Sequence, residues 1–161
     1  MKKYAIEIKW AGLFIAMQLL WMVLEKLLGW HDQYIDYHMY LTNLFAIPAI
    51  AVMTYGLREK KHRFYNGRMT FKQGMISGTI ISTIVAVMSP LTQWIISYVI
   101  TPNYFATVIK RSVEIGYFAT TAEAEAHFNY ANYAQQSVIG ALFMGILTTF
   151  IVMLFLRSKH D

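Results

Sequence analysis

The sequence predicts an all-α integral membrane protein, a four-helix bundle with a helical extracytoplasmic hairpin between its third and fourth spans. Three observations predict this class. Hydrophobic residues make up 57% of the chain and charged residues only 14%, whereas soluble domains have about a quarter charged residues. Four apolar runs are each long enough to cross a bilayer. The basic residues are concentrated in alternate connecting segments. The length of 161 residues suits a single domain, residues 1–161.

The first apolar run covers about residues 10–29 and carries no charge from Trp10 to Leu24. At about 1.5 Å per residue, a helix of this length reaches across a hydrocarbon core. Trp10 and Trp30 bracket the run, as aromatic residues do at membrane interfaces. Charged residues interrupt its beginning and no small-residue cleavage site follows it, so we interpret it as a retained span rather than a signal peptide.

The other three spans are predicted from equally apolar runs at about residues 39–57, 73–100 and 135–156. Pro48 and Pro90 lie inside the second and third runs, where they predict kinks that neighbouring helices can accommodate. The third run is longer than one straight crossing requires, so we expect it to tilt or bend.

The distribution of basic residues predicts the orientation of the chain. Eleven of the 14 Lys and Arg residues lie at the termini or between the second and third spans, and only Lys110 and Arg111 lie on the opposite side. Because basic residues favour the cytoplasmic side, we expect both termini to be cytoplasmic. The basic connection then sets topology and lies against anionic headgroups, and we expect no nucleic-acid partner. The six basic residues of the connection are Arg58, Lys60, Lys61, Arg63, Arg68 and Lys72, and the five at the termini are Lys2, Lys3, Lys9, Arg157 and Lys159.

Residues 102–134 form the one long segment outside the predicted spans. Pro102 follows a threonine, a pattern typical of a helix start, and Gly116 fits the end of that helix. Thr120 and Glu123 have the spacing of a capping box at the start of a second helix. We expect the two helices to form a hairpin that either caps the bundle or lies on the membrane.

Small residues recur at every fourth position of the third and fourth spans, so each series forms a ridge on one helix face. Such ridges let membrane helices approach closely, because lipid supplies no hydrophobic drive for association. We expect the ridges to pack against another helix, either of this chain or of a partner. They comprise Gly74, Gly78, Ser82 and Ala86 in the third span, and Ser137, Ala141, Gly145 and Thr149 in the fourth.

Polar residues gather in the segment HDQYIDYH after the first span, and with one glutamate and one later histidine they form a candidate outer polar cluster. Histidines and carboxylates this close together are able to bind a divalent metal. Their spacing matches no metal motif, however, so we expect a solvated acidic loop with no metal and no cofactor. The cluster comprises Glu25, His31, Asp32, Asp36, His38 and His127.

Motifs for catalysis are absent from the sequence. There is no cysteine, which excludes disulfides and thiolate chemistry, and no phosphate-binding loop, G-x-S-x-G or H-E-x-x-H occurs. We therefore assign no catalytic residue and favour a non-enzymatic assembly, scaffold or accessory subunit. A transporter or carrier of a small or lipidic substrate, and an outer-leaflet lipid or glycan enzyme, remain alternatives. The expected partners are the lipid bilayer and a second copy or another membrane protein.

A resemblance to a known family extends along the whole chain. It is carried by MTFKQGMISGTIISTIVAVMSPLTQWIISYVITPNYFATVIKRSVE and then by QQSVIGALFMGILTTFIVMLF. These stretches combine an aromatic-x-x-Gly entry to the third span, a small-residue face, and a proline before an amphipathic outer helix. They resemble the bacterial four-span membrane proteins catalogued as domain of unknown function 4199, abundant in Bacteroidota. The resemblance implies a multi-pass protein of the cytoplasmic (inner) membrane of a Gram-negative bacterium, and it implies no catalytic residue.

Overall fold

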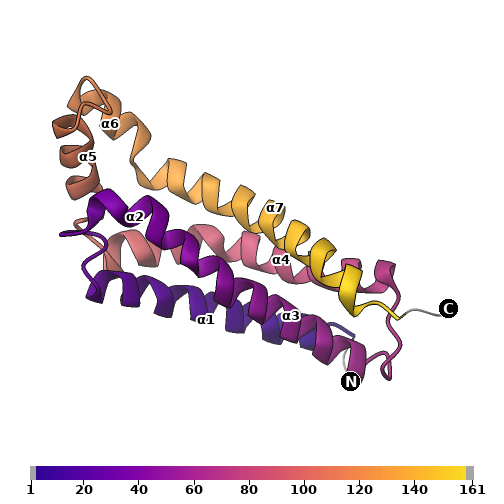
Figure 1. Cartoon of the computed structure of the whole chain (residues 1–161). Helices are drawn as coiled ribbons and strands as arrows, with labels where there is room; N and C mark the ends of the chain where they lie inside the picture. The colour runs from indigo at the N-terminus through magenta and orange to yellow at the C-terminus, as the bar shows by residue number, and fades with distance from the viewer. Residues whose placement is uncertain (1–2, 159–161) are drawn as a thin grey trace.

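The computed structural model describes residues 3–158, and this part of the chain is helical with no strand. Four long helices run along one another: α1 (Ala5–Leu27), α3 (Ala46–Arg63), α4 (Phe71–Ile95) and α7 (Tyr130–Leu156) (Figure 1). Each belongs to a helical stretch long and apolar enough to cross a membrane. The predicted all-α bundle with four membrane-spanning helices is therefore confirmed, whereas the exact limits of each span stay predictions.

Shorter helices extend or connect the long ones. α2 (Ile35–Leu41) and the 3-10 turn η1 (Thr42–Phe45) lead directly into α3, and the π-helical turn η2 (Ile96–Ile100) continues α4. Between η2 and α7 lie α5 (Tyr104–Glu114) and α6 (Thr121–His127). Two helices thus occupy the segment where the sequence predicted two, and how they sit on the membrane stays a prediction.

The sequence signals around α5 and α6 are followed at two helix ends and not at a third. Thr120 accepts a hydrogen bond from the backbone N–H of Glu123 and begins α6. Gly116 follows the end of α5 with a φ of 73°, a conformation that favours glycine. The predicted start of α5 at Pro102 is wrong, because the helix begins at Tyr104. The preceding Thr101 instead donates its hydroxyl to a carbonyl at the beginning of η2.

α4 is the central helix, which packs along α7 and also contacts α1 and α3. Its four ridge residues are all buried. Gly78 lies against Thr149, and Gly145 of α7 lies against Ser82, so closely that a Cβ on either glycine would overlap its neighbour. The two small-residue ridges therefore meet each other within one chain.

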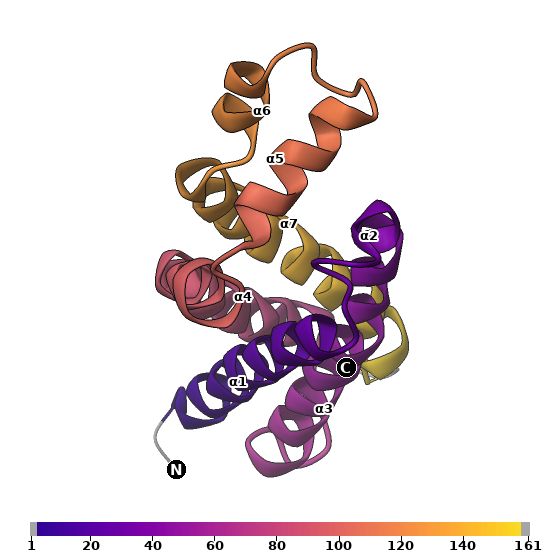
Figure 2. The same ribbon diagram turned by 90° about the vertical axis from the view of Figure 1, so that its left-hand side faces the viewer.

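The two ends of the bundle differ. The beginning of α1, the end of α7 and the connection between α3 and α4 lie together at one end, the terminal end, whereas α2, α5 and α6 lie at the other, the loop end (Figure 1). Viewed from the loop end, α5 and α6 stand on the α7 side, away from α1 and α3 (Figure 2). Because the number of long helices is even, the chain returns to the end of the bundle at which it began. The predicted basic residues Lys2 and Lys159 lie outside the described residues.

A buried ion pair joins three helices at the terminal end. Lys60 Nζ lies 2.8 Å from Glu7 Oε1, and both side chains are almost fully buried. Ser77 Oγ donates to the same carboxylate at 2.7 Å, and Lys60 also donates to the Lys3 carbonyl at 2.7 Å. This corrects one expectation: the ammonium of Lys60 is turned into the bundle and does not lie against headgroups. The other five basic residues of the connection remain exposed or partly exposed.

Candidate functional site

The site is built around Glu25, which lies in the last two turns of α1 and has a fully buried side chain. Trp21 precedes it by one helical turn and donates its indole N–H to the carboxylate. After α1 the chain reverses at Gly29, whose φ of 73° is readily adopted only by glycine. This reversal brings the following segment and α2 back toward Glu25.

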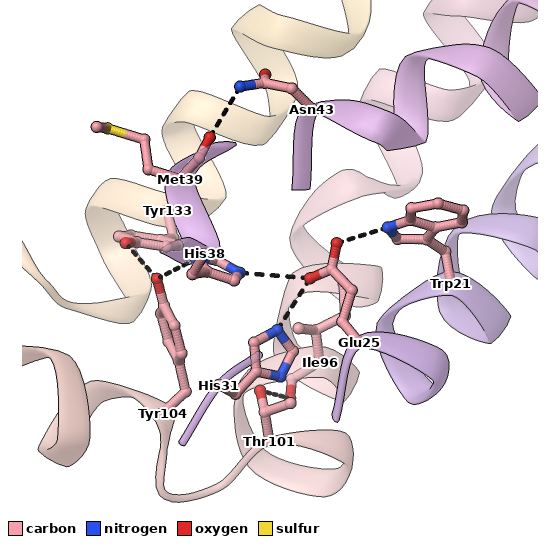
Figure 3. Close-up of polar contacts among 10 residues, drawn as sticks. All are labelled: Trp21, Glu25, His31, His38, Met39, Asn43, Ile96, Thr101, Tyr104 and Tyr133. Atoms are coloured by element: carbon pink, nitrogen blue, oxygen red, sulfur yellow. Dashed lines mark hydrogen bonds and ion pairs between the residues drawn. The ribbon is translucent and has the colours of Figure 1, made fainter. Parts of the chain in front are cut away.

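Two histidines meet at the Glu25 carboxylate (Figure 3). His31 Nε2 lies 2.9 Å from Glu25 Oε2, and His38 Nε2 lies 3.3 Å from the same oxygen. Because an ionised carboxylate only accepts hydrogen bonds, each imidazole donates from Nε2. His31 is almost fully buried and His38 is 16% exposed. One ligand-type atom from each of the three residues lies within 4.8 Å of the others.

Tyrosines from two further helices extend this network. The Tyr104 hydroxyl of α5 lies 3.4 Å from His38 Nδ1 and 3.2 Å from the Tyr133 hydroxyl of α7 (Figure 3). Burial raises the pKa of Tyr104 far above its usual value, so the phenol keeps its proton. A neutral imidazole that donates from Nε2 accepts at Nδ1, so in that tautomer of His38 the Tyr104 hydroxyl is the donor. The network therefore links α1, α2, α5 and α7.

One buried nitrogen of the network is unpaired. His31 Nδ1 has no hydrogen-bond partner among the described residues, and in Figure 3 it faces Thr101. The Thr101 hydroxyl donates to the Ile96 carbonyl at 2.9 Å, which leaves its own acceptor capacity free. Leaving a buried polar group unpaired costs about 1–3 kcal/mol, so this nitrogen requires an explanation.

A chamber of about 610 Å³, lined by both polar and apolar side chains, lies beside the network at the loop end. Residues from α1, α2, α4, η2, α5 and α7 line it, with several histidines and one arginine among them. Its polar and aromatic lining includes His31, His38, Gln93, Tyr104, Arg111, His127 and Tyr133.

An apolar groove of about 340 Å³ adjoins the chamber within the span region. Gln18 and Thr42 line both spaces, so they mark the junction. α3 and α7 contribute the two sides of the groove, and α1 and α4 also contribute to its lining. Its lining includes Phe14, Ile50, Met53, Ile81, Val85, Ser137, Gly140, Ala141 and Gly145.

The structure brings together only part of the predicted outer polar cluster, namely Glu25 and the two histidines. Asp36 instead forms a bidentate pair with Arg111, with both N–O distances 2.7 Å. Asp32 is exposed, as expected for a solvated loop. His127 lines the chamber but packs against Phe118 and Phe128. His31 differs most from the expectation of a solvated loop, because it is buried.

The sequence reasoning missed three members of the network. Trp21 had a detectable signal, because residues four apart share one face of a helix and it precedes Glu25 by four. Tyr104 and Tyr133 had no such signal in the sequence. Tyr104 meets His38, and Tyr133 meets Tyr104, only because separate helices pack together.

Comparison with known proteins places the chain in one family. Residues 9–158, nearly the whole chain, match the family described as "Protein of unknown function (DUF4199)". The resemblance inferred from the sequence is thus confirmed. No curated protein and no solved structure matches the chain.

Proposed function

The chain belongs to the DUF4199 family of proteins of unknown function, and we propose that this membrane protein binds an amphiphile at its loop end. One observation carries the proposal: an apolar groove adjoins, at Gln18 and Thr42, a chamber whose lining includes ionisable side chains. An amphiphile has the same division, with an apolar chain and a polar head.

The groove has room for an acyl chain at the depth of the spans. A Cβ added to Gly140 meets no heavy atom within 4 Å, so neighbouring side chains do not fill the groove there. Short side chains line the groove at Ala46 and Ala49 on α3 and at Ala141 on α7, and they leave space inside it. An acyl chain that moves from lipid into this groove exchanges one apolar surrounding for another and gains little. Affinity must therefore come from the head group.

The chamber favours an anionic head group. Arg111 has five N–H groups, of which three are paired with Asp36 and Glu114, and His127 adds an imidazole to the lining. The carboxylate of Asp36 also lines the chamber, but it is already paired with Arg111. A guanidinium with unpaired N–H groups is a feature of sites that bind a phosphate or carboxylate.

We further infer a location in the cytoplasmic (inner) membrane of a bacterium, with both termini cytoplasmic. The excess of basic residues on the side of the termini supports this orientation. The beginning of α1 and the end of α7 lie at one end of the bundle, which supports a shared side for the two termini (Figure 1). The chamber then faces the outer leaflet, from which the amphiphile enters.

The experiment fills the groove and measures retained lipid. Ala141→Trp places an indole in the groove, and Phe143→Trp is the matched control, since Phe143 is on the same helix but 66% exposed. We expect the wild-type protein and the control to retain an anionic lipid through delipidation, and Ala141→Trp to lose most of it. Mass spectrometry of the lipids that remain with each folded protein provides the measurement. Equal retention by both variants contradicts the proposal.

A second candidate, an assembly or accessory module, is supported by the same groove. Its small residues on α7 also suit close approach of a helix from a second copy or another membrane protein. Because the chain contains no cysteine, Ala141→Cys is a clean crosslinking probe in native membranes. Crosslinking to another protein without lipid retention favours assembly. Transport of the amphiphile and chemistry on its head group both require that the protein first binds the amphiphile. Tests of these two functions therefore follow the lipid-retention experiment.

A further inference from the structure

We propose that Glu25, His31 and His38 form a binding site for a divalent transition-metal ion, with Zn²⁺ as the preferred ion. The three residues come from α1, the segment after it and α2, and they meet at the loop end beside the chamber. The proposal goes beyond amphiphile binding and does not depend on it, because the donor atoms are present whether or not a lipid is bound.

The donor set matches the preferences of zinc. Two imidazole nitrogens and one carboxylate oxygen form a known zinc-binding set that leaves a fourth position open. Bonds of about 2.0–2.1 Å in a tetrahedral site put neighbouring donor atoms about 3.3–3.4 Å apart. From Glu25 Oε2, His31 Nε2 lies at 2.9 Å and His38 Nε2 at 3.3 Å. These two distances are within about half an ångström of the tetrahedral spacing, and all three donor atoms lie within 4.8 Å of one another.

The charge balance of the site also points to a cation. Glu25 is fully buried, and its ion-pair partners in the described part of the chain are the two histidines, with no lysine or arginine. Imidazoles bind an ion only in their neutral form, in which they do not compensate a buried carboxylate, and a buried charge without compensation is costly. A divalent ion supplies the missing positive charge.

The surrounding groups are arranged to orient the ligands. When Nε2 of His38 binds an ion, its single N–H moves to Nδ1 and donates to Tyr104, whose own proton then points to Tyr133. The same shift puts an N–H on His31 Nδ1, the buried atom that is unpaired in the metal-free arrangement. In the view of Figure 3 this atom is drawn next to Thr101, with which it forms no hydrogen bond in the metal-free arrangement. Two neutral imidazoles change tautomer in this way without net loss of a proton.

The three protein ligands leave a fourth coordination position of the ion open. His31 and His38 both line the chamber, so the open side of the ion is accessible from that space. Water is able to complete the coordination there, and so is an anionic oxygen of a bound head group.

The test is a metal titration of the purified, chelator-treated protein in detergent without added lipid. We expect one Zn²⁺ per chain by calorimetry. We also expect Co²⁺ to give the intense visible bands of a tetrahedral site. Glu25→Gln preserves the shape of the side chain and should weaken Zn²⁺ binding by at least about 100-fold, the upper end of what second-layer changes cause. Tyr104→Phe should weaken it by about 10–100-fold.

Two histidine variants serve as controls. His62→Gln changes an exposed residue at the terminal end, and His127→Gln changes a chamber residue outside the triad. Both should retain one Zn²⁺ per chain with wild-type affinity. If Glu25→Gln does not fold, Zn²⁺ must still raise the unfolding temperature of the wild-type protein and give the Co²⁺ spectrum. No stoichiometric binding by the wild-type protein, or unchanged affinity in Glu25→Gln, overturns the proposal. Because no lipid is present, that result leaves the lipid-retention experiment unaffected.

Discussion

At the scale of single residues, α1 carries two buried carboxylates that differ in the charge of the groups around them. Glu7 is paired with Lys60 and accepts from Ser77, so the protein itself neutralises it. Glu25 has two imidazoles and one indole as hydrogen-bond partners, with no lysine or arginine among them. The first environment is typical of a structural ion pair, whereas the second favours binding of a cation.

The Glu7–Lys60 pair leads to a stability prediction. Lys60→Met leaves the Glu7 carboxylate buried without a cation, and we expect a loss of about 3–5 kcal/mol in the free energy of unfolding. The double variant Glu7→Leu/Lys60→Met removes both charges and should be more stable than Lys60→Met alone. Thermal or denaturant unfolding in detergent, followed by circular dichroism, measures both differences.

Lys72→Met is the matched control, because Lys72 is exposed and lies in the same basic connection. It should change the free energy of unfolding by no more than about 0.5 kcal/mol. A double variant less stable than either single variant would show that the pair is not held by mutual compensation of charge.

At the scale of helices, the contact between α4 and α7 depends on the absence of side chains. Gly78 and Gly145 each face a short, stiff residue of the opposite helix, Thr149 and Ser82. Gly74 also faces a buried neighbour, Met153, but that side chain is long and has several rotatable bonds. The same substitution therefore has different consequences along one ridge.

We expect Gly78→Val to destabilise the bundle by about 1–3 kcal/mol, because the added side chain overlaps Thr149 and forces the helices apart. Gly74→Ala should cost less than Gly78→Ala, since Met153 is able to move. Unfolding in a series of denaturant concentrations gives the ranking. Gly12→Val is the control, because a Cβ at that exposed position of α1 meets nothing within 4 Å. Equal effects at Gly12 and Gly78 would contradict close packing of the two ridges.

At the scale of the whole molecule, the structure and the charge pattern make a joint prediction about topology. The connection at residue 65 lies at the terminal end and residue 118 at the loop end (Figure 1). Reporter fusions at these two positions should lie on opposite sides of the membrane. A shared side for both would overturn the four-span topology.

The basic connection can be tested separately from the buried ion pair. Neutralising Arg58, Lys61, Arg63, Arg68 and Lys72 while retaining Lys60 should produce a mixture of orientations, because the excess of basic residues on one side is reduced. The same reporters measure this mixture. Metal binding by the correctly oriented fraction should remain unchanged, since the triad lies at the opposite end.

Much of the architecture was predictable because it depends on local properties of the chain. Helix length, apolarity and capping residues act over a few positions, so the four long helices and the start of α6 follow from nearby residues. The start of α5 was mispredicted because Thr101 bonds backward to η2 instead of capping forward. Of the site, the sequence indicated Glu25 and the histidines as polar residues near a span end, but not that they meet.

The sequence by itself determined that this protein is an all-α membrane bundle. The free energy gained by burying long apolar helices in lipid exceeds any preference of nearby residues for another backbone conformation. Only the tertiary structure decided which polar groups share a site. His38 meets Tyr104 across 66 residues of sequence, and Lys60 meets Glu7 across 53. Such pairings depend on how helices pack and which faces they present, and no local pattern encodes that geometry.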